Sequence, residues 1–196
     1  MERRNFIKSI ILFNLSFLLP WKKLSINLNI KSLIRPPGSI TEEDFIEICI
    51  RCGECLKVCP AKCLKPISLE EGICEWLTPH IIPREAGCIR CLSCGEICPS
   101  GAIQKIKVEE IKIGTAKIDT ERCLVWTEKK ECLVCKEYCP VGAVSIDFRG
   151  RPIVVSDVCV GCGLCEEHCP VLGDKSAICV SPKGEKRYYL KEKKYK

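Results

Sequence analysis

The 196-residue sequence has few of the residues that build most catalytic sites and apolar cores. Aromatic residues make up only 6% of the chain, and there are two histidines and one methionine. The sequence contains no glycine-rich nucleotide loop, no flavin motif and no arrangement typical of a catalytic nucleophile. The apolar run over 9–19 is too short to cross a bilayer as a helix. These absences argue against an independent catalytic site and against a core built on aromatic residues.

Cysteine is the residue that the chain has in abundance. Sixteen of the 19 cysteines fall into four runs, each ending in Cys-Pro, and three runs have the spacing C-x2-C-x2-C-x3-C. The third run differs, because its first gap is stretched to eight residues. The runs are Cys49, Cys52, Cys55 and Cys59; Cys88, Cys91, Cys94 and Cys98; Cys123, Cys132, Cys135 and Cys139; and Cys159, Cys162, Cys165 and Cys169.

This spacing is the bacterial pattern for holding [4Fe–4S] clusters with four thiolates. Three closely spaced cysteines wrap a short loop around one face of a cubane, and glycines between them let the backbone approach the sulfurs. Structural zinc favours two C-x2-C pairs separated by a longer gap, and disulfide frameworks are typical of short secreted chains. We therefore predict that all sixteen cysteines ligate the iron of four [4Fe–4S] clusters. A chain with four clusters and little else is most simply an electron carrier rather than an enzyme.

Some residues that invite a functional interpretation are better explained by packing. Three cysteines lie outside the runs and are interpreted as small, partly buried residues: Cys63, Cys74 and Cys179. His80 and His168 stand alone, and His168, although it lies within the fourth run, is expected to pack or to face solvent rather than tune a cluster. Trp126, within the stretched run, is expected to pack beside a cluster.

The formal net charge of +6 is reduced once cofactors are counted. Four clusters with their thiolates bring the charge of the holoprotein to about −2. Much of the positive charge lies at the two chain ends, where it is most simply solvated. The charge pattern therefore gives little support for nucleic acid as a partner.

The N-terminus resembles a twin-arginine export signal. Arg3 and Arg4 are followed by Phe6 and Lys8, and then by the apolar run over 9–19. This pattern predicts that the Tat export machinery carries the folded protein to the periplasm, after clusters are inserted in the reducing cytoplasm. No clear cleavage site follows the apolar run, so the segment is expected to stay attached and to hold the protein at the membrane.

The chain divides into three parts by composition. Residues 1–34 are predicted to be a signal and linker, 35–182 a four-cluster ferredoxin-type domain, and 183–196 a basic tail. Within the domain, the repeated strings CPSGAI (98–103) and CPVGAV (139–144) indicate a unit that is half a bacterial ferredoxin. The predicted fold class is α+β and loop-rich, with two βαββαβ units related by pseudo-twofold symmetry and built around the clusters.

Local signals predict a few elements within this domain. Thr41 is a candidate cap for a short helix over 42–47. Two hairpins are expected, one pairing 144–148 with 153–155 and the other pairing 103–108 with 116–119. The region between the first two runs is expected to be mostly loop, because it is long and contains three prolines.

From Arg35 to Cys169 the chain resembles the polyferredoxins of the NapG/MauM type. The features that it shares are Arg35-Pro36-Pro37-Gly38 before the first run, the string Cys49-x-Arg51-Cys52-Gly53-x-Cys55, the stretched third run and the twin-arginine leader. The plain spacing of the second run departs from relatives that carry extra residues there. Members of this family are exported by the twin-arginine route and carry four [4Fe–4S] clusters.

The resemblance implies a place in quinol-dependent electron transfer. The expected donor is a membrane-bound ferredoxin-type or quinol-oxidising protein, and the expected acceptor is a periplasmic reductase or a multihaem cytochrome. Two alternatives stay open: the electron-transfer subunit of a molybdopterin-type membrane oxidoreductase, and an assembly factor for an exported redox enzyme.

The pairing of the runs is also open from spacing alone. The fourth cysteine of a run usually ligates the cluster of a partner run. Runs one with two and three with four would give a tandem order, whereas runs two with three inside one with four would give a nested order. The nested order is favoured, because related four-cluster subunits use it. On that order Cys59 joins the fourth run, Cys169 the first, Cys98 the third and Cys139 the second.

Overall fold

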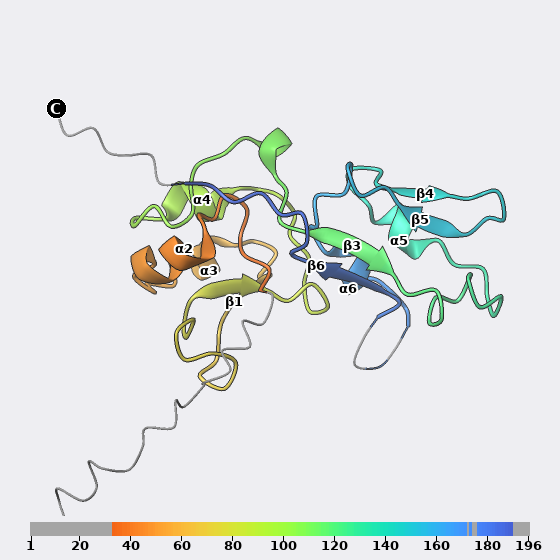
Figure 1. Ribbon diagram of the computed structural model, residues 1–196, viewed down its shortest axis with the longest axis horizontal. Coiled ribbons are helices and arrows are strands. Elements are labelled where there is room, and N and C mark those ends of the chain that lie inside the picture. The colour runs from red at the N-terminus through yellow and green to blue at the C-terminus, as the bar shows by residue number, and fades with distance from the viewer. Residues whose placement is uncertain (1–32, 172, 174–175, 190–196) are drawn as a thin grey trace, which may run out of the picture.

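The computed structural model describes residues 33–171, 173 and 176–189. The described chain forms an elongated molecule with two halves end to end, the first coloured orange to green and the second cyan to blue (Figure 1). The export signal predicted at Arg3 and Arg4 lies outside the described residues. Within the described part of the chain, no helix has the length and apolar character needed to span a membrane.

The helices are short, and four of them carry the third cysteine of a run. The helices are α2 (Glu42–Ile48), α3 (Glu54–Val58), α4 (Ser93–Ile97), α5 (Val134–Glu137) and α6 (Leu164–Glu167), with one 3-10 turn, η2 (Val108–Glu110). Helix α2 confirms the helix predicted over 42–47. Thr41 precedes it, but its hydroxyl donates to the carboxylate of Asp44 at 2.8 Å instead of capping a backbone N–H.

The strands pair in three antiparallel sheets of two strands each. They are β1 (Leu64–Pro66) with β2 (Pro79–Ile81), β3 (Thr115–Ile118) with β6 (Ile178–Ser181), and β4 (Val144–Ile146) with β5 (Pro152–Val154). The β4–β5 pair confirms the hairpin predicted over 144–155. Regular structure is sparse, as the α+β, loop-rich prediction requires.

In the second half the elements follow in the order β3, α5, β4, β5, α6, β6, with β3 paired to β6 and β4 to β5. In the first half, β1 and β2 form the inner pair, and the outer pair is reduced to a single bridge between Ser39 and Ile103. The predicted hairpin between 103–108 and 116–119 is wrong. Its first arm lies against 38–40, and β3 pairs with β6, which is 60 residues further along the chain.

The segment Arg35-Pro36-Pro37-Gly38 holds the first half together. The Arg35 side chain, 1% exposed, donates to the carboxylate of Glu42, to Thr78 Oγ1 at 2.9 Å and to the Pro79 carbonyl at 2.8 Å. Gly38 has a φ of +87°, and a Cβ there would lie 2.3 Å from the Gln104 carbonyl oxygen. The motif is therefore a buried brace that joins α2 to the β1–β2 hairpin.

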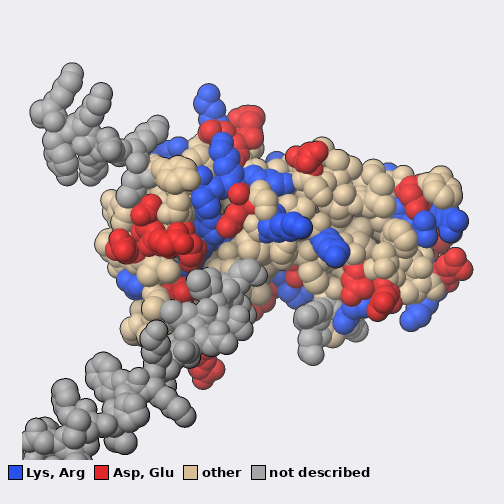
Figure 2. Space-filling model, in the orientation of Figure 1, with Lys and Arg blue, Asp and Glu red and all other residues tan. Residues whose placement is uncertain are grey.

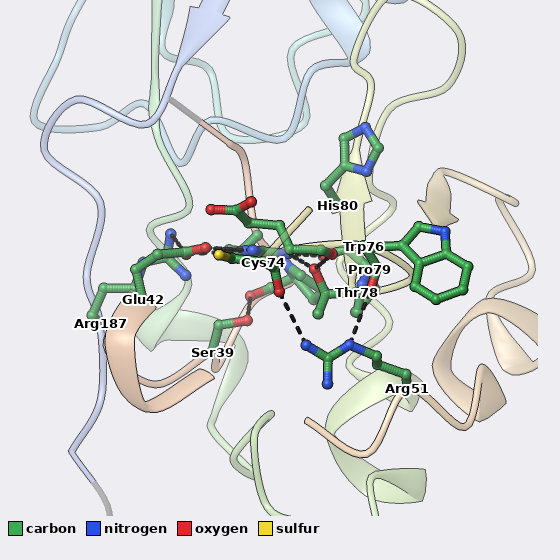
Figure 3. Close-up of polar contacts among 12 residues, drawn as sticks. Ser39, Glu42, Arg51, Cys74, Trp76, Thr78, Pro79, His80 and Arg187 are labelled. Atoms are coloured by element: carbon green, nitrogen blue, oxygen red, sulfur yellow. Dashed lines mark hydrogen bonds and ion pairs between the residues drawn. The ribbon is translucent and has the colours of Figure 1, made fainter. Parts of the chain in front are cut away.

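The C-terminal segment returns from the second half to the first. Lys186 N–H donates to the Lys112 carbonyl at 2.7 Å, and Tyr188 N–H donates to the Ser39 carbonyl at 3.1 Å. Arg187 lies 3.5 Å from Glu42, and Figure 3 shows these two side chains together. The described part of the predicted basic tail is thus packed against the first half.

Candidate metal centres

The cysteines of the four runs gather around four apolar cavities. The cavities have similar volumes, between about 320 and 360 Å³, and almost no polar surface. Site I is lined by Cys49, Cys52, Cys55 and Cys98; site II by Cys88, Cys91, Cys94, Cys59 and Cys63; site III by Cys123, Cys132, Cys135 and Cys169; and site IV by Cys159, Cys162, Cys165 and Cys139. All sixteen predicted ligands are therefore brought to the cavities.

The nested pairing of the runs is wrong. Cys59 stands with the second run and Cys98 with the first, so these two runs exchange their fourth cysteines. Cys139 and Cys169 are exchanged between the third and fourth runs in the same way. The cause is helix packing, because α3 packs against α4 and α5 against α6, which places the partner runs side by side. The order is tandem.

The local backbone explains how a run surrounds its cavity. In three of the runs, the residues immediately before and after the second cysteine both have positive φ. The pairs are Arg51 and Gly53, Arg90 and Leu92, and Gly161 and Gly163. This left-handed geometry turns N–H groups towards the first sulfur, and the N–H of Arg90 lies 3.4 Å from Cys88 Sγ. The stretched third run does not repeat the pattern, and Leu133 after Cys132 has a φ of −129°.

The chemistry of each donor set fits an iron–sulfur cluster. Thiols are the donors that line all four cavities, and soft thiolate sets select iron–sulfur clusters, zinc or copper(I). Among the described residues, no group of three or more His, Cys, Asp or Glu is arranged to hold a single metal ion. The sulfurs instead surround a space of several hundred cubic ångströms, which suits a cluster with several irons.

Burial keeps these thiols neutral when no metal binds them. Desolvation raises the pKa of Cys55 to about 12 and that of Cys94 to about 12, and desolvation also raises the pKa of Cys135 to about 11. A cluster needs thiolates, so binding must displace these protons, and metal binding is coupled to pH and folding. The cavities are therefore built for a positively charged iron core.

The four sites follow one another in a single line. Sites I and II share α3 and α4, and sites III and IV share α5 and α6. The two pairs meet where the backbone N–H of Cys88, in site II, donates to the carbonyl of Cys162, in site IV, at 2.6 Å. The spatial order is thus site I, site II, site IV and site III.

Further polar contacts fasten this junction. Arg84, from the first half, donates to the carbonyls of Glu166, Cys169 and Val171 at 2.9 to 3.0 Å. The carboxylate of Glu167 accepts from the N–H of Gly87 at 2.8 Å. Sequence reasoning missed both residues, because nothing in their local pattern distinguishes them from ordinary surface charges.

The residues set aside as packing residues have three outcomes. Trp126 packs as predicted, with its indole N–H on the Pro152 carbonyl at 3.0 Å, and His168 stacks on Tyr138 with ring centroids 3.6 Å apart. Cys74 and Cys179 line none of the four cavities. Cys63 differs from the prediction, because it is 3% exposed and lines site II.

Comparisons with known proteins identify the same cofactor. The family model "4Fe-4S dicluster domain" matches residues 87–143, and two "4Fe-4S binding domain" models match 152–172 and 46–62. These matches confirm [4Fe–4S] clusters as the cofactor. The dicluster match spans runs two and three, which share no cavity here. The side-chain positions decide the pairing, because the cysteine spacing is nearly the same in every run.

Relatives match most of the chain. The ferredoxin-type protein NapG of Escherichia coli (strain K12) is 34% identical over 165 residues, which cover 76% of this chain and 70% of NapG. The methylamine utilization ferredoxin-type protein MauM of Methylorubrum extorquens is 35% identical over 163 residues, which cover 76% of this chain and 73% of MauM.

The chain belongs to the NapG/MauM family of ferredoxin-type proteins.

The family confirms the resemblance and makes the protein an iron–sulfur carrier of electrons. MauM of Paracoccus denitrificans, 35% identical over 169 residues, supports the same assignment. The site geometry is consistent with a NapG/MauM protein in which each half of the molecule holds two cluster sites.

Proposed function

We propose that the protein passes single electrons from a quinol-oxidising membrane partner to a periplasmic reductase or multihaem cytochrome, and that it performs no bond chemistry itself. The sixteen cysteines of sites I to IV are proposed as ligands of four [4Fe–4S] clusters. Each half is then one ferredoxin unit of the βαββαβ type with two clusters. When bound, each cluster accepts and releases one electron.

The observation that carries this proposal is the linear order of the sites. Cys88 and Cys162 bring site II directly against site IV, so no gap separates the two halves. Sites I and III are then the two ends of one path through the molecule. Such an arrangement serves entry of electrons at one end and exit at the other.

The chain surrounds the path with apolar side chains. Site III is lined by Ile118, Val171 and Ile178, and site IV by Val144 and Val154, together with the cysteines. These side chains limit water at the clusters, and water exposure is one of the factors that set the potential of a cluster. The residues thus hold and insulate the cofactors.

One end of the path is open to a partner. In site I, Cys52 is exposed and the neighbouring Ile50 is 63% exposed. Arg51 braces this loop by donating to the carbonyls of Trp76 and Cys74 at 2.9 and 3.0 Å, as Figure 3 shows. The charged side chains on the face drawn in Figure 2 are mixed in sign, which suits docking between proteins.

The proposed location is the periplasmic side of the membrane. It rests on Arg3, Arg4 and the apolar run over 9–19, with the NapG/MauM membership as support. Replacing both arginines, Arg3→Lys with Arg4→Lys, should trap the protein in the cytoplasm, as measured by cell fractionation. Unchanged recovery from the periplasm would show that the two arginines are incidental.

Stopped-flow mixing tests the electron-carrier function. The reduced holoprotein should be reoxidised by its periplasmic acceptor, and deleting its gene should slow quinol-dependent reduction of that acceptor in membranes. Metal and sulfide assays should give about 16 Fe and about 16 sulfides per chain. Clusters that stay reduced while the acceptor turns over normally would instead indicate an assembly factor. Stable co-purification with a molybdopterin-containing chain would indicate a subunit of that enzyme.

A further inference from the structure

Site II contains a fifth cysteine that the other sites lack. The side chain of Cys63 is 3% exposed, and its Sγ lies 3.6 Å from the Sγ of Cys59. It also hydrogen-bonds with the thiol of Cys88, the first cysteine of the second run. Cys63 therefore stands among the ligand sulfurs of site II, between two of them.

The repeat shows that this position always faces a cluster cavity. Cys63 comes four residues after Cys59, just as Ala102 follows Cys98 and Ala143 follows Cys139. Ala102 lines site I and Ala143 lines site IV, each beside the fourth cysteine of its run, and both are 1% exposed. The fold thus keeps a small buried side chain at this place, and only in the first run does that side chain carry a sulfur.

The backbone between the two cysteines holds them in register. The N–H of Lys62 donates to the carbonyl of Cys59 at 3.1 Å, which closes a tight turn. Cys63 then leads directly into β1, so both cysteines are fixed at one wall of the cavity. An iron corner of a cubane takes one thiolate, and here two sulfurs 3.6 Å apart are within reach of the same corner.

We propose that Cys63 is an alternate ligand of the cluster in site II and can replace Cys59 at the same iron. In the exchange the bond between iron and Cys59 Sγ breaks and a bond between iron and Cys63 Sγ forms. The proton of the Cys63 thiol passes to the sulfur of Cys59, and no electron moves. The cluster keeps four thiolates, so site II tolerates the loss of a ligand that would disrupt sites I, III and IV.

Ligand deletion with a matched control tests the proposal. Cys59→Ala should keep about 16 Fe per chain and show no EPR signal of an oxidised three-iron cluster. Cys139→Ala, whose neighbour at the equivalent position is Ala143, should lose iron and show that signal. Cys59→Ala combined with Cys63→Ala should behave like Cys139→Ala. If Cys59→Ala alone loses as much iron as Cys139→Ala, Cys63 only packs and the proposal fails.

A second variant tests the geometry without relying on Cys59. Cys139→Ala combined with Ala143→Cys places a thiol at the equivalent position of site IV. This double variant should regain the iron that Cys139→Ala loses, and its EPR spectrum should return to that of the unmodified protein. Failure to regain iron, in a variant whose circular dichroism matches that of Cys139→Ala, would show that a sulfur at this position does not reach the cluster.

Discussion

The backbone N–H of Cys88 donates to the carbonyl oxygen of Cys162 at 2.6 Å, and this bond joins the two halves of the protein at two of its cluster sites. The residues around the bond leave no spare room. A Cβ on Gly87 would lie 2.6 Å from the backbone nitrogen of Leu164, and a Cβ on Gly163 would lie 2.7 Å from the Cβ of Pro83. The close approach of the halves therefore depends on glycine.

The first prediction concerns this junction. Gly163→Ala should force the halves apart, because the added methyl would overlap Pro83. Overpacking of this kind costs about 1–3 kcal/mol. The variant should keep its clusters, while reoxidation by an acceptor in a stopped-flow experiment should become biphasic, with one pair of clusters oxidised more slowly than the other.

Gly53→Ala is the matched control for the junction. Gly53 occupies the same place in the first run, with a φ of +74° against +87° for Gly163, but no atom lies within 4 Å of its added Cβ. It should share only the backbone strain, about 1–2 kcal/mol, and should be reoxidised in one phase. Equal kinetics in the two variants would contradict a junction that carries electrons between the halves.

The second prediction concerns the turn that follows each Cys-Pro. Lys62 has a φ of +51°, whereas the equivalent residues Gly101 and Gly142 have φ of +75° and +65°. Lys62 is exposed, so a change there disturbs little packing. The left-handed conformation costs a lysine about 1–2 kcal/mol, and the greater freedom of unfolded glycine returns about 0.4–1 kcal/mol of this. Lys62→Gly should therefore stabilise the protein slightly.

Thermal unfolding under anaerobic conditions measures this effect. The midpoint should rise for Lys62→Gly and fall for the reverse change, Gly142→Lys, where no atom would meet the added Cβ within 4 Å. Both variants should keep the iron content of the unmodified protein. A lower midpoint for Lys62→Gly would mean that the lysine side chain contributes more than its backbone strain costs.

The sequence predicts what depends on local spacing and misses what depends on the choice of partner. The ligand sets, the α2 helix and the β4–β5 hairpin all lie within short stretches, where cysteine spacing, a cap residue or a turn signal is sufficient. The pairing of the runs is different, because every run offers nearly the same spacing. The choice is made by the packing of α3 on α4 and α5 on α6, which local patterns do not contain.

Two further features were out of reach for the same reason. The strand at 115–118 pairs with β6 rather than with a neighbour, because the C-terminal segment returns across the molecule. Cys63 appeared to be an ordinary small residue, since only its alignment with Ala102 and Ala143 places it in a cavity. Comparing the repeats position by position was the one signal in the sequence that pointed to it.

The third prediction concerns pH, and it has opposite signs with and without clusters. In the cluster-free fold, desolvation raises the pKa of Cys55 and of Cys94 to about 12, against about 8.5 for a thiol in the unfolded chain. Above about pH 8.5 the unfolded state therefore loses protons that the folded state keeps, so the cluster-free protein should become less stable as the pH rises towards 12.

The holoprotein should show the reverse dependence. Its ligands are thiolates, and protons compete with iron for them, so falling pH favours release of the cluster. Iron loss to a chelator, followed by the visible absorbance of the clusters, should accelerate as the pH is lowered from about 8 to about 6. Denaturant unfolding of the cluster-free protein at alkaline pH gives the other arm. Parallel trends in the two forms would contradict neutral thiols in the cluster-free cavities.

The last prediction concerns the buried brace that supports site I. Arg35 is 1% exposed, and its guanidinium donates to the carboxylate of Glu42, with Nε at 3.0 Å from Oε2. Arg35 also holds the Pro79 carbonyl at 2.8 Å, and Pro79 lines site I. Removing one partner of a buried pair leaves an uncompensated charge, which costs about 3–5 kcal/mol. Because Glu42 is 23% exposed, Glu42→Gln should cost nearer the lower end, about 3 kcal/mol.

The matched control for this change is Glu43→Gln, on the exposed side of the same helix, which should alter the midpoint of thermal unfolding very little. In Glu42→Gln the lowered midpoint should be accompanied by faster loss of iron to a chelator, because α2 and Pro79 hold one wall of site I. Arg187 also lies 3.5 Å from Glu42, so truncating the chain before Arg187 should reproduce part of the effect. If both glutamine variants unfold at the same temperature, the pair contributes nothing to the fold and the brace reduces to the apolar contacts of Pro36 and Pro37.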